Sequence, residues 1–222
     1  NLGTALARAG RHQEAAEQFR RSLELNASSA LALEGLGGSL LQLGRREEGI
    51  AQIQNALQVD PKATRALENL GLIQLEEGKV DDAVRLLSQA AELRPEDGVT
   101  RVNLAKALLA GGDVKGAEAA LVEAVRLAPD SAVAHARLAL VLVESGRAGE
   151  AASHLERALD LDPRDASIRV VAGQVALRQG DVEGALGHYR LAHEAAPEDR
   201  EAALGLAAAL RRSGQSGEAA PL

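Results

Sequence analysis

A glycine recurs every 34 residues along the sequence, without an insertion or a deletion between its first and last occurrence. The seven positions are Gly10, Gly44, Gly78, Gly112, Gly146, Gly180 and Gly214. A fixed period of this length is typical of repeat proteins, in which each unit packs only against its neighbours. The sequence therefore predicts a series of similar units rather than one globular core.

Each glycine is one mark in a longer repeated pattern. A small residue follows it by five positions, from Ala15 to Ala219, and a proline follows it by seventeen, from Pro61 to Pro197. Apolar residues at helical spacing lie both before and after each glycine, which predicts two helices in every unit. Glycine ends a helix readily because it adopts a positive φ without steric cost, so a tight turn should join the two helices.

The start of each first helix carries a second signal. A short oxygen-bearing side chain two residues beyond the proline position should cap the free N–H groups of that helix. Five of the six positions supply such a side chain, namely Ser29, Asp97, Ser131, Asp165 and Asp199. The sixth is Ala63, where the adjacent Thr64 is the candidate replacement.

This unit resembles the tetratricopeptide repeat, whose helix-turn-helix has the same length. The resemblance rests on a Leu-Gly or Leu-Ala pair in the first helix, as in Leu36-Gly37, Leu70-Gly71 and Leu138-Ala139. It implies an all-α fold, an α-solenoid of helix-turn-helix repeats coiled into a right-handed superhelix. Residues 1–222 would form a single solenoid, with complete repeats at 30–63, 64–97, 98–131, 132–165 and 166–199 and partial repeats at 1–29 and 200–222.

The large aromatic residues that the family places in the first helix are absent. The only two aromatic residues, Phe19 and Tyr189, lie nine residues after their glycines, in a register otherwise filled by residues such as Leu87. We expect both rings in the core, where an apolar side chain of suitable volume can pack. No aromatic side chain is then left to stack on bases or sugars.

Composition argues against several classes of function. The net charge of −7 and the lack of a strongly basic stretch disfavour nucleic acid binding. The longest apolar run, residues 138–143, is far shorter than the ~20 residues that span a bilayer. The absence of cysteine excludes disulfides and suits the cytoplasm and the periplasm or envelope equally. The richness in alanine, arginine and glycine favours a bacterial gene.

No motif for catalysis or cofactor binding is found. The glycine-rich stretches lack the spacing of a nucleotide cradle, and no nucleophile elbow or HExxH is present. His154 and His188 share one register in successive units, so they could stack on neighbouring second helices. A metal site needs three or four converging ligands, and we therefore expect no metal, no cofactor and no catalytic residue in this segment.

Each first helix has two stripes of side chains along its surface. One stripe faces the partner helix, and the resemblance implies that the other lines a concave groove. Its apolar members are Leu72, Leu75, Val99, Val102, Leu109, Val133, Ala136, Leu140, Val143, Val170 and Leu177. The polar residues on it or beside it are Asn69, Glu76, Asn103, Lys106 and Arg137. An exposed apolar patch with a polar rim usually marks a binding surface. Alternatively, individual residues of the stripe only pack adjacent first helices together.

Asparagine recurs immediately before the Leu-Gly or Leu-Ala pair, at Asn1, Asn69 and Asn103. An amide both donates and accepts, so it can bond a peptide backbone of any sequence. This register is interrupted at Gly35, Arg137, Val171 and Gly205. Glu34 and Glu68 stand where a clamp for a C-terminal carboxylate would need a base, so binding of chaperone tails is not expected.

These features predict a noncatalytic scaffold for protein–protein interaction. Its partner would be an apolar or amphipathic segment of a protein or peptide, held in the groove within a multiprotein assembly. The alternative is the substrate-recruiting arm of a larger enzyme, such as a glycosyltransferase. The segment begins and ends inside helices, so we also expect further repeats or end-to-end self-association.

Overall fold

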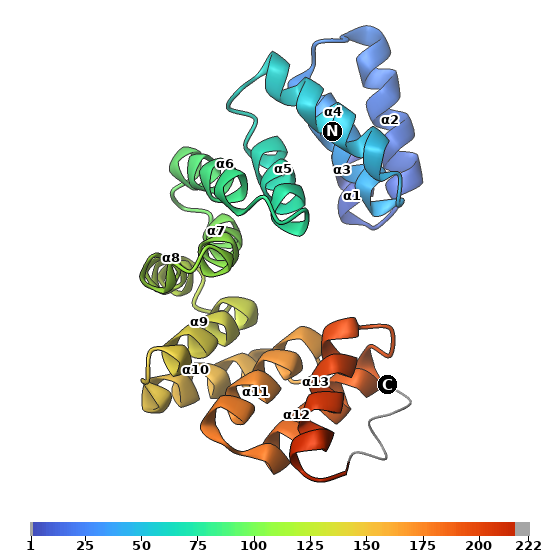
Figure 1. Ribbon diagram of the computed structural model, residues 1–222. Coiled ribbons are helices and arrows are strands. Elements are labelled where there is room, and N and C mark those ends of the chain that lie inside the picture. Colours follow the sequence, from blue (N-terminus) through green and yellow to red (C-terminus); the bar gives the residue numbers. More distant parts are fainter. Residues whose placement is uncertain (1, 216–222) are drawn as a thin grey trace. The chain divides into compact units, whose positions relative to one another are not determined.

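The computed structural model describes residues 2–215, which contain thirteen α-helices and no strand (Figure 1). The helices of the first half are α1 (Leu2–Arg8), α2 (His12–Leu25), α3 (Ala30–Gln42), α4 (Arg46–Val59), α5 (Thr64–Glu76), α6 (Val80–Leu93) and α7 (Gly98–Ala110). Those of the second half are α8 (Val114–Leu127), α9 (Ala132–Glu144), α10 (Ala148–Leu161), α11 (Ala166–Gln179), α12 (Val182–Ala195) and α13 (Arg200–Arg212). The predicted helix pairs are confirmed. Asn1, Ala219 and the end of the partial repeat 200–222 lie outside the described residues.

The chain divides into two compact units, residues 1–113 and 114–222. The N-terminal unit holds α1 to α7, and the C-terminal unit holds α8 to α13. Within each unit a first helix packs on the next first helix, as α3 does on α5 and α11 on α13. Each repeat therefore buries its apolar faces against its neighbours, which is the packing of an α-solenoid.

All seven recurrent glycines occupy the left-handed backbone region, with φ between 73° and 82°. No other residue in the range 2–215 has a positive φ. A Cβ placed on these glycines would meet no atom within 4 Å. The backbone conformation of the turn, rather than lack of space, thus requires glycine.

The small residues that follow the turns let the paired helices approach closely. Ala83 and Ala151, for example, are fully buried, and a Cβ on Gly49 would lie 3.0 Å from the carbonyl oxygen of Gly37. Any larger side chain in this register would separate the two helices of the repeat.

The caps follow the sequence with one exception. All five predicted capping side chains accept a hydrogen bond from the N–H two or three residues further on: Ser29, Asp97, Ser131, Asp165 and Asp199. Ala63 makes no side-chain cap, as expected. The prediction that Thr64 replaces it is wrong, because Thr64 is already the first residue of α5 and its hydroxyl donates to the Lys62 carbonyl at 3.3 Å.

The two aromatic rings lie in the core, as predicted, each only 2% exposed. Phe19 of α2 packs between Gly3 of α1 and Gly35 of α3. Tyr189 of α12 lies in the same way against Gly173 and Gly205. Each ring therefore occupies space left by glycines on two successive first helices.

Polar side chains occupy three of the first-helix positions that lack the family's aromatic residues. Arg101, His135 and Arg169 each bond the carbonyl of the proline six residues earlier, with closest N···O distances of 3.0, 3.1 and 2.8 Å. These bonds satisfy backbone acceptors in the loops between repeats, which would otherwise need water.

Candidate functional site

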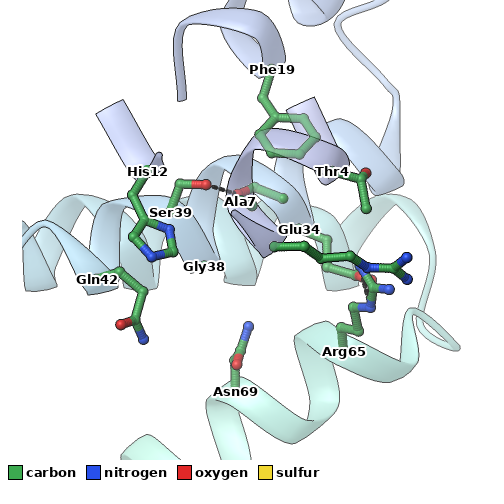
Figure 2. A pocket seen from close by; sticks show the side chains of 12 residues that line it. Thr4, Ala7, His12, Phe19, Glu34, Gly38, Ser39, Gln42, Arg65 and Asn69 are labelled. Carbon is green, nitrogen blue, oxygen red and sulfur yellow. Dashed lines mark hydrogen bonds and ion pairs between the residues drawn. The ribbon is translucent and has the colours of Figure 1, made fainter. Parts of the chain in front are cut away.

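An open pocket of about 330 Å³ lies among the first helices of the N-terminal unit (Figure 2). Helices α1, α3 and α5 supply most of its lining, and α2 adds two residues: the full set is Thr4, Ala7, Arg8, His12, Phe19, Glu34, Gly35, Gly38, Ser39, Gln42, Arg65 and Asn69. The hollow exists because α3 presents small residues there. A Cβ on Gly38 would touch only the Asn69 Nδ2 atom, at 3.6 Å, so the space above Gly38 is open.

Amide and imidazole groups surround this hollow. The Asn69 side chain points into it from α5, facing Gly38 across the opening, and makes no hydrogen bond to the other lining residues (Figure 2). Gln42 lies on the same side as His12, whose buried Nδ1 atom has no hydrogen-bond partner (Figure 2). The Ser39 hydroxyl is occupied, since it donates to the Gly35 carbonyl at 2.8 Å. Asn69 and Gln42 thus offer amides that can both donate and accept.

The charged side chains of the pocket differ in how fully they are paired with other groups. Glu34 is only 8% exposed, and burial raises the pKa of its carboxyl group. Arg65, Arg94 and the backbone N–H of Ala66 oppose that rise, and the Arg65 Nε atom lies 3.7 Å from Glu34 Oε1. Arg8 is exposed and forms no ion pair with any other residue in the described range.

Glu34 lies beside the start of α5. Ala66 is the third residue of α5, the helix whose own N-cap, Ala63, lacks a capping side chain, and its backbone N–H acts on the Glu34 carboxyl group. Glu34 on α3 therefore places a carboxyl group from the preceding repeat near the unpaired N–H groups of this helix start. One repeat later, Glu68 accepts a hydrogen bond from the buried Thr100 hydroxyl. Both acids, which the sequence left without a role, connect successive repeats.

The predicted groove residues of the N-terminal unit are all at least partly accessible. Val99 is the most exposed, at 69%. Glu76 and Lys106 are also exposed, and the half-buried ones are Asn69, Leu72, Leu75, Val102, Asn103 and Leu109. Glu76 is already paired with Arg46, whose Nη1 atom lies 2.7 Å from Glu76 Oε2. Leu75 packs in part on the core residue Leu87.

In the C-terminal unit the structure corrects the prediction for three residues. Ala136, Leu140 and Val170 are buried, at 1%, 8% and 2% exposure. The first two belong to a core cluster with Ile168, and the third to a cluster with Leu206. These three residues pack adjacent first helices together. Val133 is exposed, and Arg137, Val143 and Leu177 are half-buried.

The pocket is not predicted by the pattern of apolar side chains in the sequence. The signal for it is the set of small residues Gly35, Gly38 and Ser39 on one face of α3. Three small residues on one helix face remove volume, and a stripe defined by large side chains does not detect that loss. Gly35 is one of the positions at which the asparagine register is interrupted, so that interruption marks one of the small residues that line the pocket.

The histidines do not form the predicted stack on second helices. His154 instead contacts His135 of its own repeat, with 2.9 Å between the two Nδ1 atoms, and His188 contacts Arg169. Burial lowers the pKa of both His154 and His188, and the neighbouring His135 and Arg169, respectively, lower it further. Within residues 2–215 no group of three or more potential ligands is placed to hold a metal ion.

Two family models, both described as tetratricopeptide repeat, match the sequence. One matches residues 74–141, and the other matches 1–50, 35–98, 136–199 and 171–222. The chain belongs to the tetratricopeptide repeat family. Repeats of this family are generally noncatalytic scaffolds for protein interaction, and they bind through extended concave surfaces. Between residues 2 and 215 no helix has both the length and the apolar character needed to cross a membrane.

Solved tetratricopeptide repeat structures share the fold. TTC0263 from Thermus thermophilus is 27% identical, with a TM-score of 0.70 over 82% of this chain and 100% of that chain. YrrB, described as having an unusual peptide-binding site, is 24% identical, with a TM-score of 0.61 over 84% and 96%. PilF from Pseudomonas aeruginosa is 20% identical, with a TM-score of 0.72 over 90% and 91%. No curated protein matches the sequence. The bacterial sources of TTC0263 and PilF agree with the bacterial character of the composition.

Proposed function

We propose that this protein is an interaction scaffold that holds an extended segment of a partner protein along its first helices, with the pocket of the N-terminal unit as the main anchor. The observation that carries this proposal is the pocket itself, built on three successive first helices with the Asn69 amide directed into it (Figure 2). A hollow with a few convergent polar groups is the usual form of a binding site.

The polar groups favour an extended segment. A peptide in extended form leaves its N–H and C=O groups unpaired, so amides that donate and accept can bond it irrespective of its sequence. Asn69 and Gln42 offer such groups at the pocket, and Asn103 repeats the Asn69 register on α7. The peptide-binding site in the description of YrrB, which has the same fold, supports this mode by analogy.

Apolar residues beside the pocket would provide further contact area. Leu72 on α5 and Val99 and Val102 on α7 belong to the N-terminal unit and are partly or well exposed. Lys106 and Leu109 extend the surface along α7. In the C-terminal unit, Val133, Arg137, Val143 and Leu177 form a second, smaller candidate surface. The buried residues Ala136, Leu140 and Val170 are excluded from it.

Filling the hollow tests the proposal. The probe is a randomised hexapeptide library with acetylated N-termini and amidated C-termini, passed over immobilised protein. Gly38→Leu places a side chain in the open space, and we expect it to reduce peptide retention at least tenfold. Gly149→Leu on α10 is the matched control, because a Cβ there meets no atom within 4 Å and Gly149 is not part of the pocket.

Circular dichroism should show equal helix content for both variants and the unmodified protein. Full retention by Gly38→Leu would refute the pocket as the anchor. The alternative function, recruitment of a substrate to an attached enzyme, would use the same surface. The full-length reading frame distinguishes it, since a catalytic domain in that frame supports a recruiting arm.

A further inference from the structure

Two arginines from different repeats line the anchoring pocket. Arg8 comes from the end of α1, and Arg65 comes from the first turn of α5. Arg8 has no ion-pair partner among the residues that the structure covers. The ion pair of Arg65 with Glu34 joins Nε to Oε1 at 3.7 Å, whereas a bidentate pair between arginine and a carboxylate has two bonds of about 2.7–2.9 Å. The guanidinium groups therefore retain donors for a further acceptor.

The negative charge of Glu34 does not neutralise the positive charges of both arginines. Its carboxylate is buried beside the backbone N–H of Ala66 at the start of α5. Among the lining residues a single buried carboxylate thus stands opposite two arginines, and only the arginines reach solvent, since Arg8 is exposed and the Arg65 side chain is 42% exposed. The chain as a whole carries a net charge of −7, so this local excess of positive charge differs from the rest of the molecule.

The N-terminus of α5, where Arg65 lies, adds to the local positive charge. The N-terminus of a helix carries partial positive charge from its unpaired N–H groups. At α5 the Ala63 side chain neutralises none of it. His12, a third nitrogen base, also lines the pocket.

From this arrangement we infer that the pocket selects partner segments bearing an acidic side chain, whose carboxylate lies between Arg8 and Arg65 while Asn69 bonds the adjacent backbone. The inference rests on the proposed function and adds the chemical class of the ligand. Guanidinium groups favour carboxylates because their planar donors match two carboxylate oxygens. The acid is a side chain within the segment rather than a chain terminus, because the groove continues beyond the pocket onto α7 in the form of Val102 and Asn103.

The experiment uses the same end-blocked hexapeptide library and reads the residues retained at each position. For the unmodified protein we expect Asp and Glu to be enriched about tenfold at one position, the scale of one charge-assisted hydrogen bond. Arg8→Gln should remove most of this enrichment, and Arg8→Glu should replace it with enrichment of Lys and Arg. Arg8 is exposed at the end of a helix, so both variants should fold.

The matched control is Arg85→Glu, which makes the same charge change on an exposed arginine outside the pocket. It should retain the preference for Asp and Glu. A second library with free C-terminal carboxylates distinguishes the two sources of a carboxylate. Retention of that library alone would overturn the assignment to a side chain.

The remaining outcomes separate the inference from the proposed function. If Gly38→Leu abolishes retention but no acidic residue is enriched, or if Arg8→Glu leaves the enrichment unchanged, the inference is wrong and the anchoring pocket stands. If the unmodified protein retains no peptide from either library, both are wrong.

Discussion

The ring of Tyr189 occupies the space that a side chain at Gly205 would need. A Cβ on Gly205 would lie 2.6 Å from Tyr189 Cζ, closer than non-bonded carbon atoms approach. The same relationship joins Phe19 and Gly35, since a Cβ on Gly35 would lie 2.7 Å from Phe19 Cε2. In both places an aromatic ring nine residues after the turn glycine is matched by glycine in the next first helix, so the volumes compensate across the repeat boundary.

The first prediction concerns a helical glycine whose replacement by alanine should lower stability, although this replacement usually raises it. Gly205→Ala should destabilise the protein by about 1–3 kcal/mol, because the added methyl group overpacks the ring. In a Tyr189→Leu background the same change should stabilise by about 0.5–1 kcal/mol, the normal preference of a helix for alanine. Urea unfolding followed by circular dichroism measures both changes.

Gly187→Ala is the control for the comparison of Gly205→Ala in the two backgrounds. Gly187 lies in the same helix as Tyr189, but a Cβ there meets nothing within 4 Å. It should therefore stabilise by a similar small amount in both backgrounds. If Gly205→Ala has the same effect whether Tyr189 is present or not, the ring is not the cause.

The second prediction concerns the turn glycines. Gly146 has a φ of 76° with open space around it, so replacement by alanine should cost about 1–2 kcal/mol through backbone strain alone. Gly146→Asn should cost less, because asparagine visits the left-handed region more readily. Thermal midpoints of the two variants give the comparison. An alanine variant as stable as the asparagine variant would contradict this explanation.

The third prediction concerns the N-cap of α5, which lacks a capping side chain. Ala63→Ser restores the residue type found in this register at Ser29 and Ser131, and it should stabilise the protein by about 0.5–1 kcal/mol. Ser131→Ala removes an existing cap and should destabilise by a similar amount. Urea midpoints measure both variants. An Ala63→Ser variant that is no more stable than the unmodified protein would contradict this explanation.

The fourth prediction is a pH dependence of stability that arises from two histidines. Burial, together with His135 beside His154 and Arg169 beside His188, lowers the folded-state pKa of both histidines below the ordinary value of 6.5. The unfolded chain then binds more protons than the folded chain as pH falls below 6.5, so this contribution to stability is complete above 6.5 and is lost towards the lower folded-state pKa values.

The groups that face these histidines are known. His135 and Glu150 act on His154, and Arg169 and Asp181 act on His188. The double variant His154→Gln, His188→Gln should therefore lose less stability between pH 7 and pH 5 than the unmodified protein. Unfolding midpoints across this range measure the difference. Parallel curves would show that the two histidines do not contribute, and the opposite trend of Glu34, whose pKa is raised, would cancel in the comparison.

Much of the local structure was readable from the sequence. The glycine period placed the turn inside each repeat among the described residues, and the capping side chains located five helix starts, because positive φ and capping depend on a few adjacent residues. Phe19 and Tyr189 were assigned to the core by register alone. The turns and the caps share one physical property, since each is decided by a few adjacent residues.

The tertiary structure decided the features that depend on contacts between repeats. Periodicity placed Leu140 and Val170 on the same stripe as Val99, but only the neighbouring helix determines which of them it covers. Glu34 lies beside the start of a helix that begins 30 residues later in the chain, and the pocket arises where small residues of α3 face Asn69 of α5. The sequence by itself determined the family, the helices and their turns. The three-dimensional packing of one repeat on the next determined which side chains remain open to a partner, because burial is a property of the pair of surfaces rather than of either one.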